Sequence, residues 1–375
     1  MEIKAFQVEE WMNAYETTAT YNLAETCVDS ISLQTLFEMV GIDKMAFFDA
    51  FSRKRMTYGD IEGKPEFLEG ICGLYRNVLP EHIVTTHGAA GANHLLISSL
   101  VEAGDKVISV MPTYQQLYSI PESIGADVQI LHLKKENGYL PDLEELRRMA
   151  VPGTKLICIN NPNNPSGALM QNEMLREIVE IARDAGAYLL CDEVYRHLNQ
   201  EDGYIESIVD LYEKGISVSS MSKVFSLAGL RLGWIVTKDA ALKKQLLSHR
   251  DYCLISCGMF DEAIAAVALK HADKILARSR SLIQKNLEIL DTWVQKEPHI
   301  SYVKPKAGTT ALLHYEGEMD SVTFCKQMLD ETGVFMTPGD CFGEEKCARI
   351  GYACSSEDLT VGLEKMSEYL KKTLK

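Results

Sequence analysis

Two charged side chains stand alone in an otherwise uncharged segment of the sequence. Between Gly215 and Thr237 the only charged residues are Lys223 and Arg231, whereas 24% of the whole chain is charged. Because Ser, Met, Val and Phe flank Lys223, we expect its amine to be partly desolvated, which would lower its pKa and favour the neutral form. A neutral amine is the nucleophile that forms a Schiff base. The segment therefore predicts a covalent role for Lys223.

Further polar, glycine-containing or aromatic stretches follow the other predicted strands. In an open α/β sheet, ligands bind beyond the carboxyl ends of the strands. The residues that follow a predicted strand in this way are Gly88, Ala89, Ala90, Tyr114, Asn164, Asp192, Tyr195 and Ser220. A turn at a helix N-terminus binds phosphate, an aromatic ring stacks, an aspartate pairs with a pyridinium nitrogen, and a lysine forms an imine. Together these features describe pyridoxal 5′-phosphate as the cofactor.

The order of the motifs resembles that of the class I and II aminotransferases, which are fold-type I pyridoxal-phosphate enzymes. The family pattern N-P-x-N-P-T-G appears as "NPNNPSG", D-E-x-Y appears as "DEVY", and S-x-S-K with an arginine eight residues later appears as "SMSKVFSLAGLR". The segments "TPGDCFG" and "ARIGYACS" resemble two further family motifs. The matches run in order from about residue 58 to residue 355, which is most of the chain.

The resemblance implies a role in cofactor chemistry for each matching residue. Lys223 would carry the cofactor as a Schiff base and then act as general base and acid, and Asp192 would keep the pyridine nitrogen protonated. Tyr195 and Asn164 would hydrogen-bond the phenolic oxygen of the cofactor, and Tyr114 would stack on its ring.

The resemblance also implies how the phosphate is held. The phosphate ligands would be Ser220, Ser222, Arg231 and the backbone N–H groups of the turn formed by Gly88, Ala89 and Ala90. Tyr58 matches the family tyrosine that reaches the phosphate of the neighbouring subunit. The resemblance therefore implies a homodimer with shared active sites.

The substrate side of the site is less well determined by the motifs. Arg349 would bind the α-carboxylate of the substrate, a task that suits a planar bidentate donor, with Asn164 beside it. The segment "NLAETCVDSISL" lacks the glycine that relatives place near the substrate. Ala24 and Glu25 in this segment are predicted to line the substrate pocket. Glu25 is either a surface glutamate or a partner for a cationic substrate group, as in aminotransferase-like enzymes that act on arginine derivatives, such as capreomycidine synthase.

These residues predict an aminotransferase that moves an amino group between an L-amino acid and a 2-oxo acid by a ping-pong mechanism. A lyase or cyclase on the same scaffold, such as a cysteine-conjugate β-lyase or a capreomycidine-synthase-like enzyme, needs the same lysine and aspartate. A cofactor-binding sensor would carry a basic DNA-binding extension, which the first 40 residues do not show. A dinucleotide-binding oxidoreductase would need G-x-G-x-x-G, which "THGAAGAN" fits poorly.

Composition excludes several other classes. The net charge of −15 argues against a nucleic-acid or anionic-membrane partner. No apolar run reaches the length of a membrane span, and the first residues show no signal-peptide pattern. The ten cysteines include no CxxC pair and no zinc spacing, which indicates free buried thiols, no metal site and a cytoplasmic location.

The elements that must position these residues are alternating strands and helices. Apolar runs such as "DKVISVMPTY", "TKLICINNP" and "AYLLCDEVY" alternate with amphipathic segments, "NHLLISSLVEAG" and "NEMLREIVEIARDAG", that each close on a glycine C-cap. This pattern predicts an α/β fold with a mainly parallel sheet sandwiched by helices. We expect this large domain to span 45–262, with a smaller α+β domain formed by 1–44 and 263–375. The segment 261–295 should form one long helix or two abutting ones.

Overall fold

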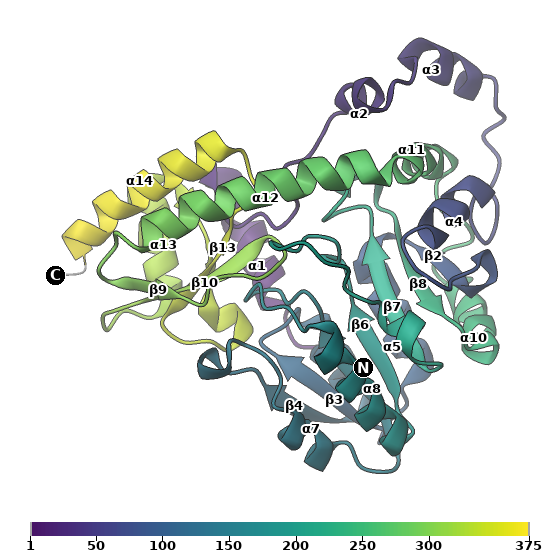
Figure 1. Ribbon diagram of the computed structural model, residues 1–375, viewed down its shortest axis with the longest axis horizontal. Helices are drawn as coiled ribbons and strands as arrows, with labels where there is room; N and C mark the ends of the chain where they lie inside the picture. The colour runs from purple at the N-terminus through teal and green to yellow at the C-terminus, as the bar shows by residue number, and fades with distance from the viewer. Residues whose placement is uncertain (1, 374–375) are drawn as a thin grey trace.

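A seven-stranded sheet forms the centre of the larger part of the molecule (Figure 1). The computed structural model describes residues 2–373. The strand order is β2-β8-β7-β6-β5-β3-β4, and β8 alone runs opposite to the other strands of this sheet. The strands are β2 (Ile83–Thr86), β3 (Lys106–Met111), β4 (Asp127–His132), β5 (Thr154–Asn160), β6 (Tyr188–Asp192), β7 (Gly215–Ser220) and β8 (Gly233–Thr237). The predicted mainly parallel sheet is confirmed.

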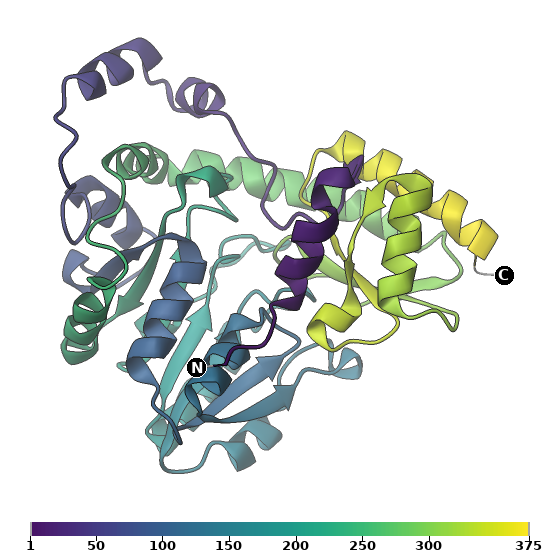
Figure 2. The same cartoon turned by 180° about the vertical axis from the view of Figure 1, so that it is seen from behind.

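Helices cover both faces of this sheet, because its central strands are apolar on both sides. In β5, Leu156 and Cys158 pack in one core, and Ile157 and Ile159 pack in another. Figures 1 and 2 show α8 on one face and α5 on the other. The helices of this part are α4 (Pro65–Cys72), α5 (Gly88–Leu100), α6 (Gln116–Ile124), α7 (Leu143–Met149), α8 (Asn172–Ala185), α9 (Ile208–Leu211), α10 (Ala240–Arg250) and α11 (Met259–Lys270).

The C-terminal third forms a smaller α+β unit, as predicted. Its antiparallel sheet has the order β12-β13-β10-β9, and a separate parallel pair joins β1 to β11. The strands are β1 (Tyr21–Asn22), β9 (Ile300–Tyr302), β10 (Thr310–Tyr315), β11 (Val334–Phe335), β12 (Thr337–Pro338) and β13 (Cys347–Gly351). The helices are α12 (Ala272–Val294), α13 (Ser321–Thr332) and α14 (Ser356–Thr373). The domain boundaries stay a prediction, and the one between 262 and 263 falls within α11.

Helix α1 (Gln7–Tyr15) connects the two parts, and Figure 2 shows it lying between them. The backbone N–H of Gln7 donates to Gln115 Oε1 at 3.0 Å in the larger part. The buried Trp11 donates from Nε1 to the carbonyl oxygen of Met336 at 2.8 Å in the smaller part. These contacts fix α1 across the space between the two sheets.

Two short helices extend from the body beside α11 (Figure 1), namely α2 (Leu33–Val40) and α3 (Lys44–Ser52). Helix α3 contacts α11 through aromatic rings, with the Phe51 and Phe260 ring centroids 5.1 Å apart. None of the residues of α3 is buried. Short 3-10 turns complete the described chain: η1 (Glu16–Thr18), η2 (Pro80–His82), η3 (Lys135–Asn137), η4 (Ala228–Leu230) and η5 (Gly339–Phe342).

The helix ends differ in part from the sequence predictions. The long segment forms two helices, α11 and α12, separated by His271, whose φ of −121° is not helical. Gly186 ends α8 in the left-handed conformation, as predicted. The glycine C-cap predicted for α5 was wrong: Val101 follows the helix in an extended conformation, and Gly104 lies in a later turn. Among the helices described for residues 2–373, none combines the length and apolar character needed to cross a membrane.

Candidate functional site

A cavity of about 310 Å³ lies where the strand ends of the larger sheet meet α1 and the segment 24–27. All but two of the residues predicted to form the site line this cavity. They are Ala24, Glu25, Ala89, Ala90, Tyr114, Asn164, Asp192, Tyr195, Ser220, Ser222, Lys223, Arg231 and Arg349. They converge because the parallel strands β3, β5, β6 and β7 present their carboxyl ends at one edge of the sheet.

The other two predicted residues lie outside the cavity lining. Gly88 begins α5 with a φ of 69°, and a Cβ atom there would lie 3.0 Å from Arg231 Nη2. Gly88 therefore allows the Arg231 guanidinium to rest against the turn. Tyr58 is 72% exposed. Its predicted role depends on a neighbouring subunit and stays a prediction.

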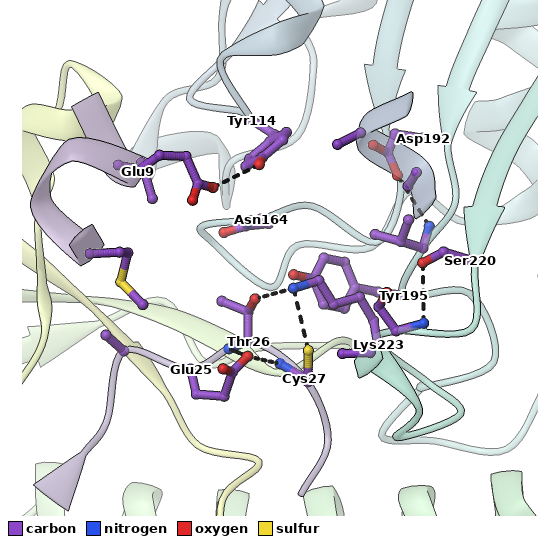
Figure 3. Close-up of a pocket in the computed structure, with 18 of the residues that line it drawn as sticks. Glu9, Glu25, Thr26, Cys27, Tyr114, Asn164, Asp192, Tyr195, Ser220 and Lys223 are labelled. Carbon is purple, nitrogen blue, oxygen red and sulfur yellow. Dashed lines mark hydrogen bonds between the residues drawn. The ribbon is translucent and has the colours of Figure 1, made fainter. Parts of the chain in front are cut away.

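Lys223 follows β7, and its amine is held by the N-terminal segment (Figure 3). Nζ donates to Thr26 Oγ1 at 2.6 Å and lies 3.6 Å from Cys27 Sγ. Burial lowers the pKa of Lys223, but Tyr195, Cys27 and Glu25 raise it, and the net pKa lies above the ordinary value. The predicted lowering of the pKa was therefore wrong. Of the groups that raise the pKa, Tyr195 follows β6, whereas Cys27 and Glu25 come from a segment distant in the sequence.

Asp192 ends β6, and its side chain is buried, with 4% exposed. Oδ2 accepts from Asn93 Nδ2 at 3.0 Å, and Oδ1 accepts from the Val194 N–H at 3.2 Å. Burial raises the pKa of Asp192 despite these hydrogen bonds and the charge of Lys223. A buried carboxylate at the wall of a cavity is stabilised by a cationic ligand group, such as a protonated ring nitrogen.

Tyr195 presents a buried hydroxyl to the same cavity. The side chain is 2% exposed, and its Oη has no hydrogen-bond partner among the described residues. Burial raises the pKa of Tyr195, so the phenol stays protonated at neutral pH and can donate. Buried hydroxyl groups in folded proteins are paired as a rule, and this one therefore indicates an acceptor on a ligand.

The turn before α5 has backbone N–H groups that an anion could bind. His87 at the N-cap makes no side-chain cap, and no acidic residue lies in the first turn, so the backbone N–H groups there remain available. Arg231 adopts a left-handed conformation with a φ of 51°, which costs about 1–3 kcal/mol in a non-glycine residue. Its Nη1 donates to the carbonyl oxygen of Ala228 at 2.9 Å. Strain of this kind is typical of functional positions.

Arg349 on β13 reaches the cavity from the smaller part and is 3% exposed. Nη2 donates to the carbonyl oxygen of Ala24 and to Thr337 Oγ1, both at 3.0 Å, and Nη1 donates to Asn164 Oδ1 at 3.2 Å. Nε has no partner among the described residues. Burial lowers the pKa of Arg349, and a carboxylate ligand would restore a counter-charge.

Sequence reasoning missed several residues that contact the predicted ones. Asn93 binds Asp192, Thr26 and Cys27 lie at the Lys223 amine, and Glu9 Oε1 accepts from Tyr114 Oη at 2.8 Å (Figure 3). Asn93 carried a weak signal, since it is an amide inside an apolar helix. Thr26 and Cys27 adjoin the predicted Glu25, and Glu9 carried no signal.

The residues of the cavity fit pyridoxal 5′-phosphate. The amine of Lys223 can react with an aldehyde, the carboxylate of Asp192 suits a ring N–H, and the unpartnered Tyr195 hydroxyl suits a phenolic oxygen. The turn at Gly88 and the guanidinium of Arg231 suit a phosphate dianion.

Comparisons with known proteins agree with this fit. Residues 45–366 match the family model described as "Aminotransferase class I and II". The chain is 32% identical over 293 residues to capreomycidine synthase of Streptomyces vinaceus, covering 78% of this chain and 75% of that protein. It is 29% identical to aspartate aminotransferase of Pyrococcus horikoshii, covering 82% of each. The fold resembles the crystal structure of a PLP-dependent aminotransferase from Streptococcus suis 89-1591, with a TM-score of 0.97 and 44% identity over 100% of both chains.

Proposed function

The chain belongs to the class I and II aminotransferases, enzymes that use pyridoxal 5′-phosphate, and from this premise we propose that it transfers the amino group of an L-amino acid to a 2-oxo acid by a ping-pong mechanism. The observation that carries the proposal is the convergence of Lys223, Asp192, Tyr195 and Arg349 on one cavity of about 310 Å³. Each of the four has a chemical task that the reaction requires.

The cofactor would be held from both ends. When bound, pyridoxal 5′-phosphate supplies an aldehyde that captures the amino group and a ring that accepts electrons from the substrate Cα. Asp192, oriented by Asn93, would hold the proton on the ring nitrogen, and the Tyr195 hydroxyl would donate to the phenolic oxygen. Tyr114, tied by its hydroxyl to Glu9, would cover the ring.

The phosphate would bind at the start of α5. The backbone N–H groups of Ala89 and Ala90 face no side-chain acceptor, and Arg231 lies against Gly88. Ser220 and Ser222, which also line the cavity, would donate from their hydroxyl groups.

Lys223 and Arg349 would act on the substrate itself. Arg349 would bind the α-carboxylate, because hydrogen bonds to Asn164 and Thr337 already fix the orientation of its guanidinium group. Lys223 Nζ would take and return the proton at the substrate Cα. The hydrogen bond to Thr26 Oγ1 holds this amine at the cavity wall, which reduces the entropy lost in reaching the reactive position.

A homodimer with shared active sites is part of the proposal. Within a single protomer, large apolar side chains remain exposed along the segment that carries α3 and Tyr58, including Met45, Met56 and Ile61. An exposed apolar patch of this kind supports a protein partner, and a second copy would bring Tyr58 to the phosphate of its neighbour. Light scattering should give twice the protomer mass of 41.9 kDa. A monomer that retains full activity would contradict the shared site.

Ring closure or elimination is the second candidate. It is favoured by the 32% identity to a capreomycidine synthase and by the position of Glu25 in the cavity. The two reactions differ in what leaves after the Cα proton has been removed, and both need Lys223 and Asp192.

One experiment separates the two candidates. Holoenzyme is mixed with a panel of amino acids and no 2-oxo acid, and the cofactor spectrum and the products are followed together. An aminotransferase yields one 2-oxo acid per active site and converts the cofactor to its pyridoxamine form. A lyase or cyclase releases ammonia, thiol or a cyclised amino acid over many turnovers with the cofactor spectrum retained. The Lys223→Ala variant should do neither.

A further inference from the structure

We propose that this cavity selects amino-acid substrates whose side chain carries a positive charge, a guanidinium or an ammonium group. The inference rests on the proposed function, because it assumes that the cavity holds the cofactor and an amino acid. Three carboxylates, those of Glu9, Glu16 and Glu25, line the cavity. Among residues 2–373, none of the three makes an ion pair with lysine, arginine or histidine.

Each of these carboxylates is fixed in place by uncharged donors only. Tyr114 Oη donates to Glu9 Oε1 at 2.8 Å, and Asn22 Nδ2 donates to Glu16 Oε1 at 2.9 Å. Two backbone N–H groups donate to Glu25 Oε1, both at 2.7 Å. For Glu9 and Glu16, the second carboxylate oxygen accepts no hydrogen bond from another side chain in the described part of the chain. The three carboxyl groups are therefore oriented without a salt bridge, and only Glu25 lies close enough to Lys223 for that charge to lower its pKa.

Glu25 keeps its charge although it is partly buried. Burial raises the pKa of Glu25, but the positive charge of Lys223 and the two backbone N–H groups lower it, and the net pKa lies below the ordinary value. The carboxylate is therefore ionised at neutral pH. Figure 3 shows Glu9 and Glu25 on the side of the cavity away from Asp192, where a substrate side chain would extend.

The cations that line the cavity all have other tasks. They are Lys223, Arg231 and Arg349. In the proposed function, Lys223 joins the cofactor aldehyde, Arg231 binds the phosphate and Arg349 binds the α-carboxylate. Within one protomer no lining cation then remains for the three glutamates, and burying carboxylates without a counter-charge is costly. A cationic substrate side chain would supply the missing counter-charge.

The balance between acidic and basic side chains in the cavity lining also argues against a dicarboxylic substrate. Aspartate would bring a second carboxylate, for which the lining residues of one protomer offer no further cation. Like charges placed together in a binding site cost several kcal/mol. Two buried groups that line this cavity, the hydroxyl of Tyr195 and the Nε of Arg349, lack partners among the described residues and are available to a ligand.

Binding of unreactive ligands to the holoenzyme tests the proposal without turnover. The probes are 5-guanidinopentanoate, which is arginine without its amino group, its neutral isostere 5-ureidopentanoate, and succinate, which is aspartate without its amino group. Calorimetry should show the guanidino compound binding at least about tenfold more tightly than the ureido compound, with succinate the weakest. Equal affinity for the guanidino and ureido compounds, or tighter binding of succinate, would overturn the proposal.

Charge-removing variants test which residues carry the selectivity. Glutamine keeps the Oε1 acceptor, so Glu9→Gln, Glu16→Gln and Glu25→Gln should retain the local hydrogen bonds. Each should reduce the guanidino-to-ureido affinity ratio severalfold, and the triple variant should bring it close to one. Glu10→Gln is the matched control, because Glu10 lies on the same helix but is exposed and outside the cavity lining. An unchanged ratio in the triple variant would overturn the assignment.

The outcomes distinguish this inference from the proposed function. If the guanidino compound binds preferentially but no amino acid converts the cofactor to its pyridoxamine form, selection of cations stands and aminotransfer fails. If L-aspartate is transaminated and the guanidino compound has no advantage, aminotransfer stands and this inference fails.

Discussion

Asn93 Nδ2 donates a hydrogen bond to Asp192 Oδ2 at 3.0 Å, and both side chains are buried. The contact joins the first turns of α5 to the end of β6. One helix would therefore contribute both to the proposed anion site and to the position of the Asp192 carboxylate. Asn93 would affect the reaction through Asp192, without contacting the substrate. It favours the ionised form of Asp192, which the ring nitrogen requires.

Replacing Asn93 should therefore shift the pH dependence of activity. Without its hydrogen bond, the already raised pKa of Asp192 should rise further, and activity on the acid side should be lost at a higher pH than in the wild type. We expect Asn93→Ala to weaken cofactor binding about tenfold, on the order of one charged hydrogen bond. A pH profile of kcat/KM and a cofactor titration measure both effects. Asn137→Ala, in an exposed turn, is the control. If the acid side of the kcat/KM profile does not shift in Asn93→Ala, Asn93 does not set the pKa of Asp192.

A side chain at Gly88 should damage phosphate binding specifically. The new Cβ would lie 3.0 Å from Arg231 Nη2, so Gly88→Ala should displace the guanidinium and raise the Kd for the cofactor at least about tenfold. Gly138→Ala is the matched control, because Gly138 has a similar φ of 64° but no atom within 4 Å of the new Cβ. Both variants should lose about 1 kcal/mol of stability through backbone strain. Equal cofactor affinity in the two variants would rule out the proposed contact.

Arg349→Ala should weaken amino-acid binding and leave the cofactor in place. Removing a buried bidentate donor costs about 3 kcal/mol, which corresponds to about a hundredfold increase in KM. The Kd for the cofactor should stay within about twofold of the wild-type value. Because Arg349 also binds Asn164 and Thr337, Arg349→Lys controls for loss of charge and volume. Steady-state kinetics measure the KM for the amino acid, and a titration measures the Kd for the cofactor. Equal weakening of amino-acid and cofactor binding would argue against Arg349 as the site for the substrate carboxylate.

Glu262 should make stability fall as the pH rises. Burial raises the pKa of Glu262 from 4.5 to about 7. Between these values the folded protein holds a proton that the unfolded chain has lost, so the contribution of Glu262 to stability decreases from pH 4.5 to pH 7. Glu262→Gln retains the acceptor for the Lys64 N–H, which lies 3.0 Å from Oε2. Thermal unfolding should show this variant more stable than wild type by about 3 kcal/mol at pH 8, with little difference near pH 4.5. A difference that does not vary with pH would contradict the pKa.

The sequence predicts the larger sheet and most of the site because both depend on local patterns. Central parallel strands are buried on both faces, so β5 and β6 appear as continuous apolar runs, and the polar residues after them must meet at one edge. Asp192, Tyr195 and Lys223 could be placed in this way.

The remaining features depend on tertiary packing that no local pattern encodes. Helix α1 reaches the cavity because Trp11 is anchored to Met336, and this contact brings Glu9 to Tyr114. The pKa of Lys223 was predicted in the wrong direction partly for the same reason: besides Tyr195, the groups that raise it are Cys27 and Glu25, which approach from about 200 residues away in the chain.

The most direct test of the central claim is the identity of the lysine that carries the cofactor. Holoenzyme is treated with borohydride, digested, and mapped by mass spectrometry, with Lys223→Ala treated in parallel. The account predicts a pyridoxyl group on the peptide that contains Lys223 and no labelled lysine in the variant. Label on a different lysine, or a protein that stays colourless and unlabelled when pyridoxal 5′-phosphate is supplied, would contradict it.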